Sequence, residues 1–457
     1  MADFRESNPS SIGQRTSDLF HHIGKNVTVG GWVHDIRNKG NIAFIELRDD
    51  TGIVQLIAKR EKVSDKVMES VNQLGKEDVI LVRGMVLESK IAKAGYEMVP
   101  TELEILSKAE SPLPLDPKSE EKELAEKGVF KSDFDTRMNN RVLDLRTPLN
   151  LAILRIQAKL LEGIQNYLNK KGFVQVFTPC IIGGASEGGA EVFKIDYFGK
   201  EAYLRQDPQL HRQLLIAAGL RGLYDLGPSW RAEKSHTQRH LCEHRGCAVE
   251  LSFISDESDV IRMEESLVAS SIDYAMKSCE DELKRFFPLV ERKTPKLPFP
   301  EIRFPQIYDI LNEYGHHIEY GDDYDREGEL LLNRYVNEKF DSDFFFVNRF
   351  PTKTKPFYVM ALDDEPQWAR SVDLLYRGVE VSSGGQREHR RNNILAQLKE
   401  RKIDLKSMEW FTEPFRYGVP PHGGFNLGIE RLTTQLLLRE NVREVTPFAR
   451  DPERLLP

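Results

Sequence analysis

The first part of the chain is marked by short runs of β-branched and other apolar residues, which are typical of β-strands. These runs lie at 27–33, 43–47, 53–58 and 79–88. The segment RDDTG, between the second run and the third, predicts a tight turn. Because several short strands follow one another within residues 27–107, we predict a small β-barrel in this part of the chain.

From about residue 143 the apolar positions follow a helical spacing. The residues that carry it are Ile153, Ile156, Leu160, Ile164 and Leu168. Residues three and four positions apart share one face of a helix, so this segment predicts an amphipathic helix. Strand-like segments such as 172–179 and 248–254 then mix with helical ones, without the regular β-α-β alternation of a parallel sheet. We therefore predict an α+β fold in which helices flank an antiparallel sheet.

The stretch between these two parts, residues 108–128, is rich in Pro, Lys and Glu. That composition is typical of a connecting segment rather than of a packed element. We predict a hinge or linker over 108–142 that could hold a short helix. It would join a barrel domain at 1–107 to a larger domain at 143–457.

Composition narrows the class of protein. The chain has 457 residues, of which 40% are apolar and 30% charged, which fits two soluble globular domains. The net charge of −8 argues against a protein that coats nucleic acid, unless its basic residues are clustered. Four cysteines in this length indicate reduced thiols rather than a disulfide scaffold. The polar N-terminus and the lack of any apolar run near eighteen residues predict a cytoplasmic protein without a membrane span.

The segment WRAEKSHTQRHLCEH at 230–244 concentrates basic, acidic and sulfur-bearing residues, and three interpretations are open. His240, Cys242 and His244 alternate, so on a strand they would share one face, and with Cys247, which follows shortly, they could hold zinc. The neighbouring arginines would repel a dication, which disfavours this interpretation. A second interpretation is an exposed hairpin with solvated charges.

The third interpretation is a pocket for a phosphate-bearing nucleotide. Arg231 and Arg239 carry planar guanidinium groups that match phosphate oxygens. Downstream, Glu380 and Ser383 offer oxygen ligands for Mg²⁺, and Arg431 offers another clamp. Neither GxxxxGK[ST] nor GxGxxG occurs in the sequence. Arginines on an antiparallel sheet would therefore have to hold ATP.

This arrangement is similar to that of the class II aminoacyl-tRNA synthetases. GFVQVFTP resembles their first motif, WRAEKSHTQRHLCE their second and GGFNLGIERL their third. The segments ASEGGAEVF, QDPQLHRQLL, RGVEVSSGGQREHR and YGVPPHGGF resemble the aspartyl/asparaginyl branch. The tail REVTPFARDPERLLP resembles aspartyl enzymes of the archaeal type. On these motifs the chain is identified as a member of the family, from about residue 25 to the end.

The resemblance implies ATP-dependent activation of L-aspartate to aspartyl-adenylate, then transfer to tRNA-Asp. It implies ATP as substrate, Mg²⁺ as metal and a homodimer formed through the first motif. For ATP and catalysis it implies Arg231, Ala232, Glu233, Arg239, His240, Leu241, Glu380, Gly428, Ile429, Glu430 and Arg431. For the amino acid it implies Glu187, Gln209, Leu210, His211, Arg212, Arg231, Ser383 and Arg387. For the metal it implies Glu380, Ser383 and Asp373.

The same resemblance implies that the N-terminal barrel is an OB-fold that reads the tRNA anticodon. Phe44 matches the stacking residue of the family, and Arg37 and Gln55 match its base-reading groups. Alternation in AFIEL puts Phe44 on the face opposite Ala43, Ile45 and Leu47, which favours exposure of its ring. His34 resembles members that charge both tRNA-Asp and tRNA-Asn, so tRNA-Asn is an open second substrate.

Three positions depart from the pattern of the family. Asp207 replaces a serine, Arg212 replaces a lysine, and Ala248 stands where aspartyl enzymes carry an aspartate. We favour compensation, in which Asp207 holds Arg212 and aspartate remains the substrate. The rival hypothesis is a paralogue with a different amino-acid specificity or a small-molecule product. A third hypothesis, a binding module on an inactive scaffold, is disfavoured by the intact Arg231, Glu380 and Arg431.

Overall fold

The computed structural model describes residues 13–92, 94–184, 191–234 and 237–456. Packing divides the chain into two compact units, Met1–Leu151 and Ala152–Pro457, each with its own hydrophobic core.

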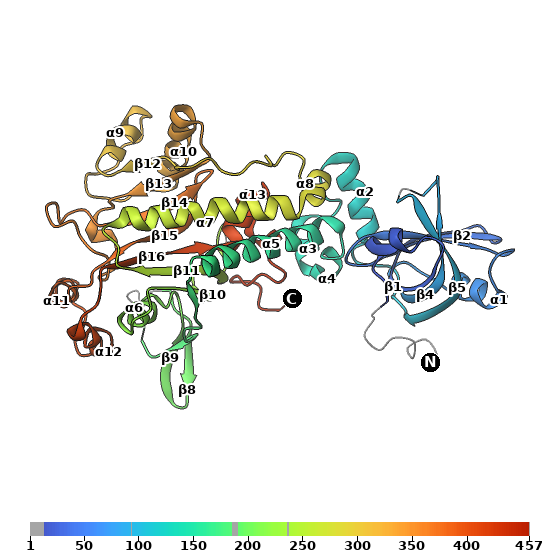
Figure 1. The fold of residues 1–457 in the computed structure, drawn as a ribbon, viewed down its shortest axis with the longest axis horizontal. Coiled ribbons are helices and arrows are strands. Elements are labelled where there is room, and N and C mark those ends of the chain that lie inside the picture. The colour runs from blue at the N-terminus through green and yellow to red at the C-terminus, as the bar shows by residue number, and fades with distance from the viewer. Residues whose placement is uncertain (1–12, 93, 185–190, 235–236, 457) are drawn as a thin grey trace. The chain divides into compact units, whose positions relative to one another are not determined.

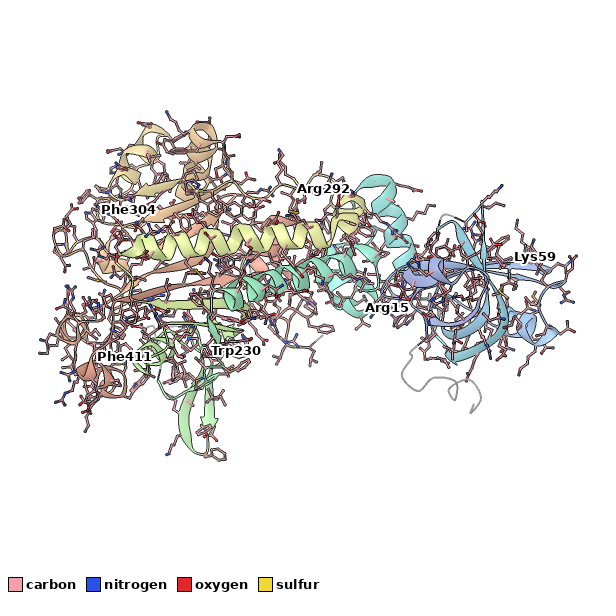
Figure 2. The ribbon with its side chains drawn as sticks, in the orientation of Figure 1. Arg15, Lys59, Trp230, Arg292, Phe304 and Phe411 are labelled. Atoms are coloured by element: carbon pink, nitrogen blue, oxygen red, sulfur yellow. The ribbon has the colours of Figure 1, made fainter. Side chains whose placement is uncertain are left out.

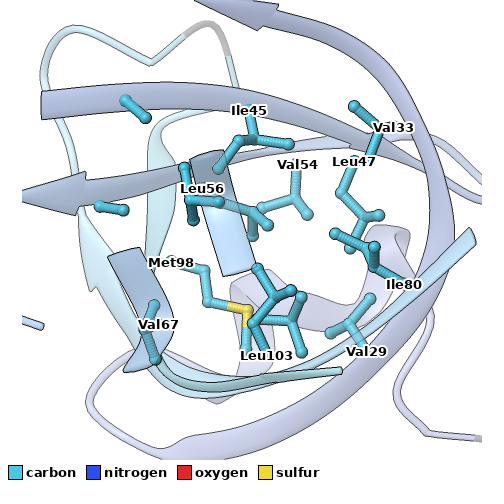
Figure 3. Close-up of a cluster of buried hydrophobic side chains, with 14 of the residues drawn as sticks. Val29, Val33, Ile45, Leu47, Val54, Leu56, Val67, Ile80, Met98 and Leu103 are labelled. Carbon is cyan, nitrogen blue, oxygen red and sulfur yellow. The ribbon is translucent and has the colours of Figure 1, made fainter. Parts of the chain in front are cut away.

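The first unit contains the predicted barrel. Its five strands close in the order β1-β2-β3-β5-β4 (Figure 1). They are β1 (Asn26–Asn38), β2 (Ile42–Arg48), β3 (Ile53–Lys59), β4 (Val79–Glu88) and β5 (Tyr96–Ser107). Ala43, Ile45 and Leu47 are fully buried in the barrel core, as the alternation along β2 predicted. Figure 3 shows Ile45 and Leu47 among the other apolar side chains of this core. Strand β5 and helix α1 (Asp65–Asn72) were not among the predicted elements.

Residues 108–144 hold more helix than the expected short one. They form α2 (Pro117–Lys127), α3 (Phe134–Asn139) and α4 (Arg141–Asp144). Helix α2 has strong end signals, because Asp116 caps its N-terminus and accepts a hydrogen bond from the Lys118 amide at 3.1 Å. Its C-terminus ends at Gly128, which has a φ of 73°.

The second unit is built on one large sheet with the strand order β12-β13-β14-β15-β16-β11-β10-β6. Its strands are β6 (Val174–Gln175), β10 (Gly222–Trp230), β11 (Glu243–Ser252), β12 (Glu301–Arg303), β13 (Phe344–Asn348), β14 (Ser371–Tyr376), β15 (Val379–Arg387) and β16 (His422–Gly428). All pairs are antiparallel except β6 with β10 and β12 with β13. The predicted α+β fold with an antiparallel sheet is confirmed.

The strand expected over 172–179 is much shorter than predicted. Only β6 pairs with β10, because the chain then leaves the ladder and Thr178 binds the Asp225 carboxylate instead. A second, three-stranded sheet follows in the order β7-β9-β8. Its strands are β7 (Ile181–Ile182), β8 (Lys194–Tyr197) and β9 (Lys200–Leu204).

Two long helices, α5 (Pro148–Lys170) and α7 (Glu257–Ser278), run along one face of the large sheet (Figure 1). The predicted apolar stripe of α5, from Ile153 to Leu168, is fully buried. The shorter helices are α6 (Gln209–Ala217), α8 (Glu280–Phe286), α9 (Gln306–Glu313), α10 (Arg326–Phe340), α11 (Arg391–Glu400), α12 (Glu409–Thr412) and α13 (Ile429–Leu436). Among the described residues, none of the helices combines the length and apolar composition needed to cross a bilayer.

Aromatic side chains fill the cores beside the sheet. Phe304 follows β12 and packs with the residues of α9 and α10, whereas Phe411 lies in α12 (Figure 2). Both rings are at most 1% exposed. One core supports the sheet edge formed by β12 and β13, and the other supports helices α6, α11 and α12.

Candidate active site

The register of the large sheet gathers polar residues from distant parts of the sequence. Directly opposite residues on paired strands point to the same face. One such row consists of Asp225, Ala248, Asn426, Ser383 and Asp373, on five neighbouring strands. A cavity of about 550 Å³ lies over this face, and Asn426, Ser383 and Asp373 line it. The predicted metal ligands Asp373, Glu380 and Ser383 therefore all line this cavity.

One end of the cavity is lined by alternating cations and carboxylates. Arg231 lies 3.5 Å from a Glu233 oxygen, and Arg431 donates to the Glu380 carbonyl at 2.9 Å and lies 3.4 Å from its carboxylate. The guanidinium of Arg239 donates to Glu329, on α10, at 3.0 Å. A neighbouring glutamate therefore orients each of these arginines, and planar guanidinium groups held in this way can bind phosphate oxygens.

The carboxylates near this end crowd one another around Lys355. Its ammonium lies 3.2 Å from Asp373, and Asp323 and Glu380 also line the cavity. Burial raises the pKa of Asp373 to about 6; Lys355 opposes this rise and Glu380 adds to it. One Asp373 oxygen, Oδ1, is buried and has no hydrogen-bond partner among the described residues. Asp373 and Glu380 offer oxygen donors of the kind that Mg²⁺ takes, but no three acidic side chains of the described residues form a metal-binding group, so phosphates would have to supply the remaining ligands.

The other end of the cavity holds a buried network of two arginines and two acids. Arg212 binds both oxygens of Asp207, at 2.6 and 2.7 Å, and also donates to Gln209 at 2.7 Å. Arg387 donates to Glu250 at 3.1 Å and to Gln209 at 3.0 Å. Although burial opposes ionisation of Asp207, the Arg212 guanidinium holds the pKa of Asp207 below its usual value. This network fixes the arginines before any ligand arrives.

The residues of the zinc interpretation do not converge. Cys247 pairs with Leu226 and Leu427 on the opposite face of the sheet, and burial raises the pKa of its thiol to about 12. Cys242 is directed to the backbone carbonyl of Glu233, at 3.9 Å. Within the part of the chain that the structure describes, no three His, Cys, Asp or Glu side chains form a metal-binding group. The geometry favours the nucleotide interpretation.

Comparison with known proteins decides the family. Residues 133–452 match the family described as "tRNA synthetases class II (D, K and N)". Residues 27–106 match the "OB-fold nucleic acid binding domain". The chain belongs to the class II tRNA synthetases.

Similar proteins cover nearly the whole of this synthetase. It is 43% identical over 434 residues to the aspartate–tRNA(Asp) ligase of Pyrococcus horikoshii, covering 95% of this chain and 97% of that one. It is 42% identical over 436 residues to the aspartate–tRNA(Asp/Asn) ligase of Methanopyrus kandleri, covering 95% of this chain and 96% of that one. A solved structure of asparaginyl-tRNA synthetase from P. horikoshii, complexed with asparaginyl-adenylate, superposes with a TM-score of 0.89 at 32% identity, covering 97% and 99% of the two chains.

The structure of the synthetase brings most of the predicted site residues together. Those that line the cavity are Gln209, Arg231, Glu233, Arg239, His240, Leu241, Asp373, Glu380, Ser383, Arg387, Gly428, Glu430 and Arg431. Those that do not line it are Ala232, Leu210, His211, Arg212 and Ile429. Glu187 lies outside the described residues.

The helical geometry of α6 explains why Leu210, His211 and Arg212 do not line the cavity. Gln209 and Arg212 are three residues apart, so both face the sheet, but Arg212 is fully covered by its partners. Leu210 packs into the core around Phe411, and the His211 ring lies 5.3 Å from that of Trp410. Arg212 therefore acts behind the cavity wall rather than in the cavity.

Sequence reasoning missed several residues of the synthetase that line the cavity. Asp323 and Lys355 come from loops between the recognised motifs. Glu329, on α10, orients Arg239 but does not itself line the cavity. Asn426 lies inside the third motif but was not among the predicted site residues. Alternation along β16 was the one available signal, since it puts Asn426 on the same face as Gly424 and Gly428.

In the barrel, the predicted base-reading residues share the outer face. Arg37 lies directly opposite Phe44, and Gln55 lies opposite Glu46, the next residue on that face of β2. The Arg37 side chain is 71% exposed, so it is accessible to a partner. His34 differs, because its ring is fully buried and bonded to Arg48 at 2.6 Å and to Glu121 at 2.8 Å. Any influence of His34 on tRNA would have to act through that network.

His244 lines the cavity and provides a pH-dependent term in the stability of the synthetase. Burial, with the charges of Arg231 and Arg431, lowers the pKa of His244 to about 4. The unfolded chain binds that proton near pH 6.5, so stability falls as pH drops from about 6.5 to 4 and levels off below. We expect the wild type to lose more free energy of unfolding in this window than His244→Gln does. Urea unfolding at stepped pH measures it, and equal losses in the two proteins would contradict the assignment.

Proposed function

We propose that this synthetase is an aspartate–tRNA ligase. It joins L-aspartate to ATP as aspartyl-adenylate with release of pyrophosphate, then transfers the aspartyl group to tRNA-Asp with release of AMP. The observation that carries the proposal is that Arg387 lines the same cavity as Arg231 and Arg431, the arginines that match phosphates. A fixed cation near one end suits a substrate carboxylate, and the relatives named above support aspartate.

The chemistry of activation needs charge stabilisation more than proton transfer. The α-carboxylate of the amino acid attacks the α-phosphorus, so the nucleophile is already ionised and pyrophosphate leaves in line. Arg231 stabilises the negative charge that develops on the α-phosphate, and Arg239 and Arg431 hold the outer phosphates. Glu380, Ser383 and Asp373 would hold Mg²⁺, which supplies further neutralisation of phosphate charge when it is bound.

The barrel supplies the contact with the anticodon of the tRNA. The half-buried ring of Phe44 stacks on a base, while Arg37 and Gln55 contact the bases with their polar groups. Some relatives carry the printed name aspartate–tRNA(Asp/Asn) ligase, so tRNA-Asn is a second acceptor to test. We expect the enzyme to act in the cytoplasm, where charged tRNA is used.

A second copy of the chain is the partner we propose for the first motif. Val174, Phe177 and Ile181 are 46%, 83% and 45% exposed, and they lie close together in sequence around β6 and β7. Exposed apolar residues in such a group mark an interaction surface. A homodimer would cover them.

A changed amino-acid specificity is the second candidate function, and a specific observation favours it. Arg212 is fully buried and bonded to Asp207, so the cavity presents Asp207 rather than a second cation. Ala248 adds no carboxylate to that wall. Such a wall would accept an amino acid whose side chain donates hydrogen bonds as well as accepting them.

Exchange of radioactive pyrophosphate into ATP separates the two functions. With aspartate, asparagine and glutamate offered in turn, we expect exchange with aspartate at least tenfold faster than with either alternative. The Arg387 guanidinium favours the side-chain carboxylate of aspartate over the neutral amide of asparagine. The distance between Arg387 and the phosphate-matching end of the cavity is fixed, which disfavours the longer side chain of glutamate. Exchange with asparagine or glutamate alone would establish the changed specificity. Aminoacylation of tRNA-Asp and tRNA-Asn transcripts then measures the choice of tRNA.

A further inference from the structure

Part of the cavity wall is made of residues without a side chain. Gly246 and Gly428, which lie opposite each other on β11 and β16, both line the cavity. Ala248 follows on the same face of β11 but does not line it. Asn426 stands among them, with Ala248 on one side and Ser383 on the other. The carboxamide of Asn426 therefore borders the cavity beside residues that have no side chain, where a bound ligand could contact it.

The position of the Asn426 carboxamide is defined by the neighbouring glycine. A Cβ atom added to Gly246 would lie 2.2 Å from Asn426 Oδ1, closer than any real contact. The amide therefore lies directly over Gly246. It can keep this place only because residue 246 has no side chain.

The oxygen of this carboxamide lacks a hydrogen bond. Asn426 Oδ1 is buried and has no partner among the described residues, although the residue lines the cavity. Leaving a buried acceptor unsatisfied costs on the order of 1–3 kcal/mol. A ligand that donates a hydrogen bond to this oxygen would remove that cost.

The neighbouring groups indicate which part of the ligand is the donor. Ser383, on one side, belongs to the end that matches phosphates, where ligands offer mainly acceptors. At the end of the cavity around Arg387, Gln209 Oε1 already accepts from Arg212 and Arg387. The α-ammonium group of an amino acid carries three donors and needs acceptors in this region. Asn426 Oδ1 is an acceptor still open to it.

We propose that Asn426 is an amino-acid-binding residue whose Oδ1 accepts a hydrogen bond from the α-ammonium of the amino acid. This inference rests on the proposed function, in which the cavity holds an amino acid and ATP together. Gly246 is its positioning partner, since it leaves room for the amide.

The test compares variants of Asn426 in pyrophosphate exchange with the full-length enzyme. Asn426→Leu keeps the volume but removes the acceptor, so we expect the KM for aspartate to rise about tenfold, which corresponds to about 1.4 kcal/mol. The KM for ATP should stay within twofold. Asn426→Asp keeps an acceptor oxygen and should restore the KM for aspartate to within threefold of wild type. Asn337→Leu, an exposed asparagine on α10, is the matched control and should change neither constant.

The glycine supplies an independent test. Gly246→Ala pushes the amide away and should raise the KM for aspartate as Asn426→Leu does. In the double variant with Asn426→Gly the alanine meets no carboxamide, so its own effect should disappear. An effect of Gly246→Ala that persists in that background would overturn the positioning role.

The outcomes distinguish this inference from the proposed function. Wild-type exchange with aspartate combined with an unchanged KM in Asn426→Leu overturns only the role of Asn426. An equal rise in the KM for ATP also overturns it and assigns the carboxamide to the nucleotide. If wild type uses another amino acid instead, the proposed function fails and the same series is run with that amino acid. Exchange with none overturns both.

Discussion

Arg231→Ala should lower the rate constant of aspartate-dependent pyrophosphate exchange by about a thousandfold, the size of effect seen when one group that stabilises transition-state charge is removed. Arg231 lines the cavity and is held near Glu233 rather than buried in a structural pair. Its loss therefore leaves the developing charge on the α-phosphate without that support. Because the effect falls on the transition state, kcat should change more than the KM for ATP.

Arg334→Ala is the matched control for this experiment. Arg334 lies on α10, is 66% exposed and pairs with Glu338 at 2.8 Å, outside the cavity. We expect its loss to change exchange less than twofold. A similar small effect for Arg231→Ala would show that charge stabilisation at the α-phosphate comes from elsewhere.

The elements of the fold were predictable where the hydrophobic period was clear. The alternation in β2 and the three-and-four spacing in α5 each gave the buried face correctly, because one side of each element packs on a core. Helix α2 was underestimated, since its polar surface hides it among linker-like residues and only its caps mark it. Strand β6 was overestimated, because pairing depends on a partner strand rather than on the local sequence.

The site was predictable residue by residue only where motifs fixed a role. The motifs predicted Arg231, Glu380 and Arg431 for one site, and all three line the same cavity. Arg212 does not line it, because its burial depends on Asp207 and on the way α6 lies on the sheet. The juxtaposition of Asn426 and Gly246 depends on the register between β11 and β16, which no local pattern encodes.

That dependence on register also explains how the cavity can vary without loss of the fold. The glycines and the polar row belong to ladder positions whose backbone bonds do not depend on their side chains. Exchanges such as a carboxylate moved from position 248 to position 207 therefore change the wall of the cavity and leave the sheet intact. The buried charge of Arg212 must still be balanced by a carboxylate such as Asp207, so we expect a large loss of stability when that balance is removed.

Asp207→Asn should destabilise the second unit by roughly 3 kcal/mol, because it leaves the fully buried Arg212 cation without its bidentate partner. The remaining carboxylate near that guanidinium, Glu250, lies 3.9 Å from its Nε. The double variant Asp207→Asn with Arg212→Met removes both charges, so it should be less destabilised than the single variant.

Urea unfolding followed by tryptophan fluorescence measures these changes, since Trp230, Trp368 and Trp410 all belong to the second unit. Asp363→Asn is the control, because its partner Arg390 retains Glu388 and the pair is largely exposed; it should cost less than about 1 kcal/mol. A double variant with a lower free energy of unfolding than Asp207→Asn would contradict this charge-balance explanation. It would mean that the Arg212 guanidinium contributes through its bond to Gln209 and its packing, rather than through a charge that Asp207 must balance.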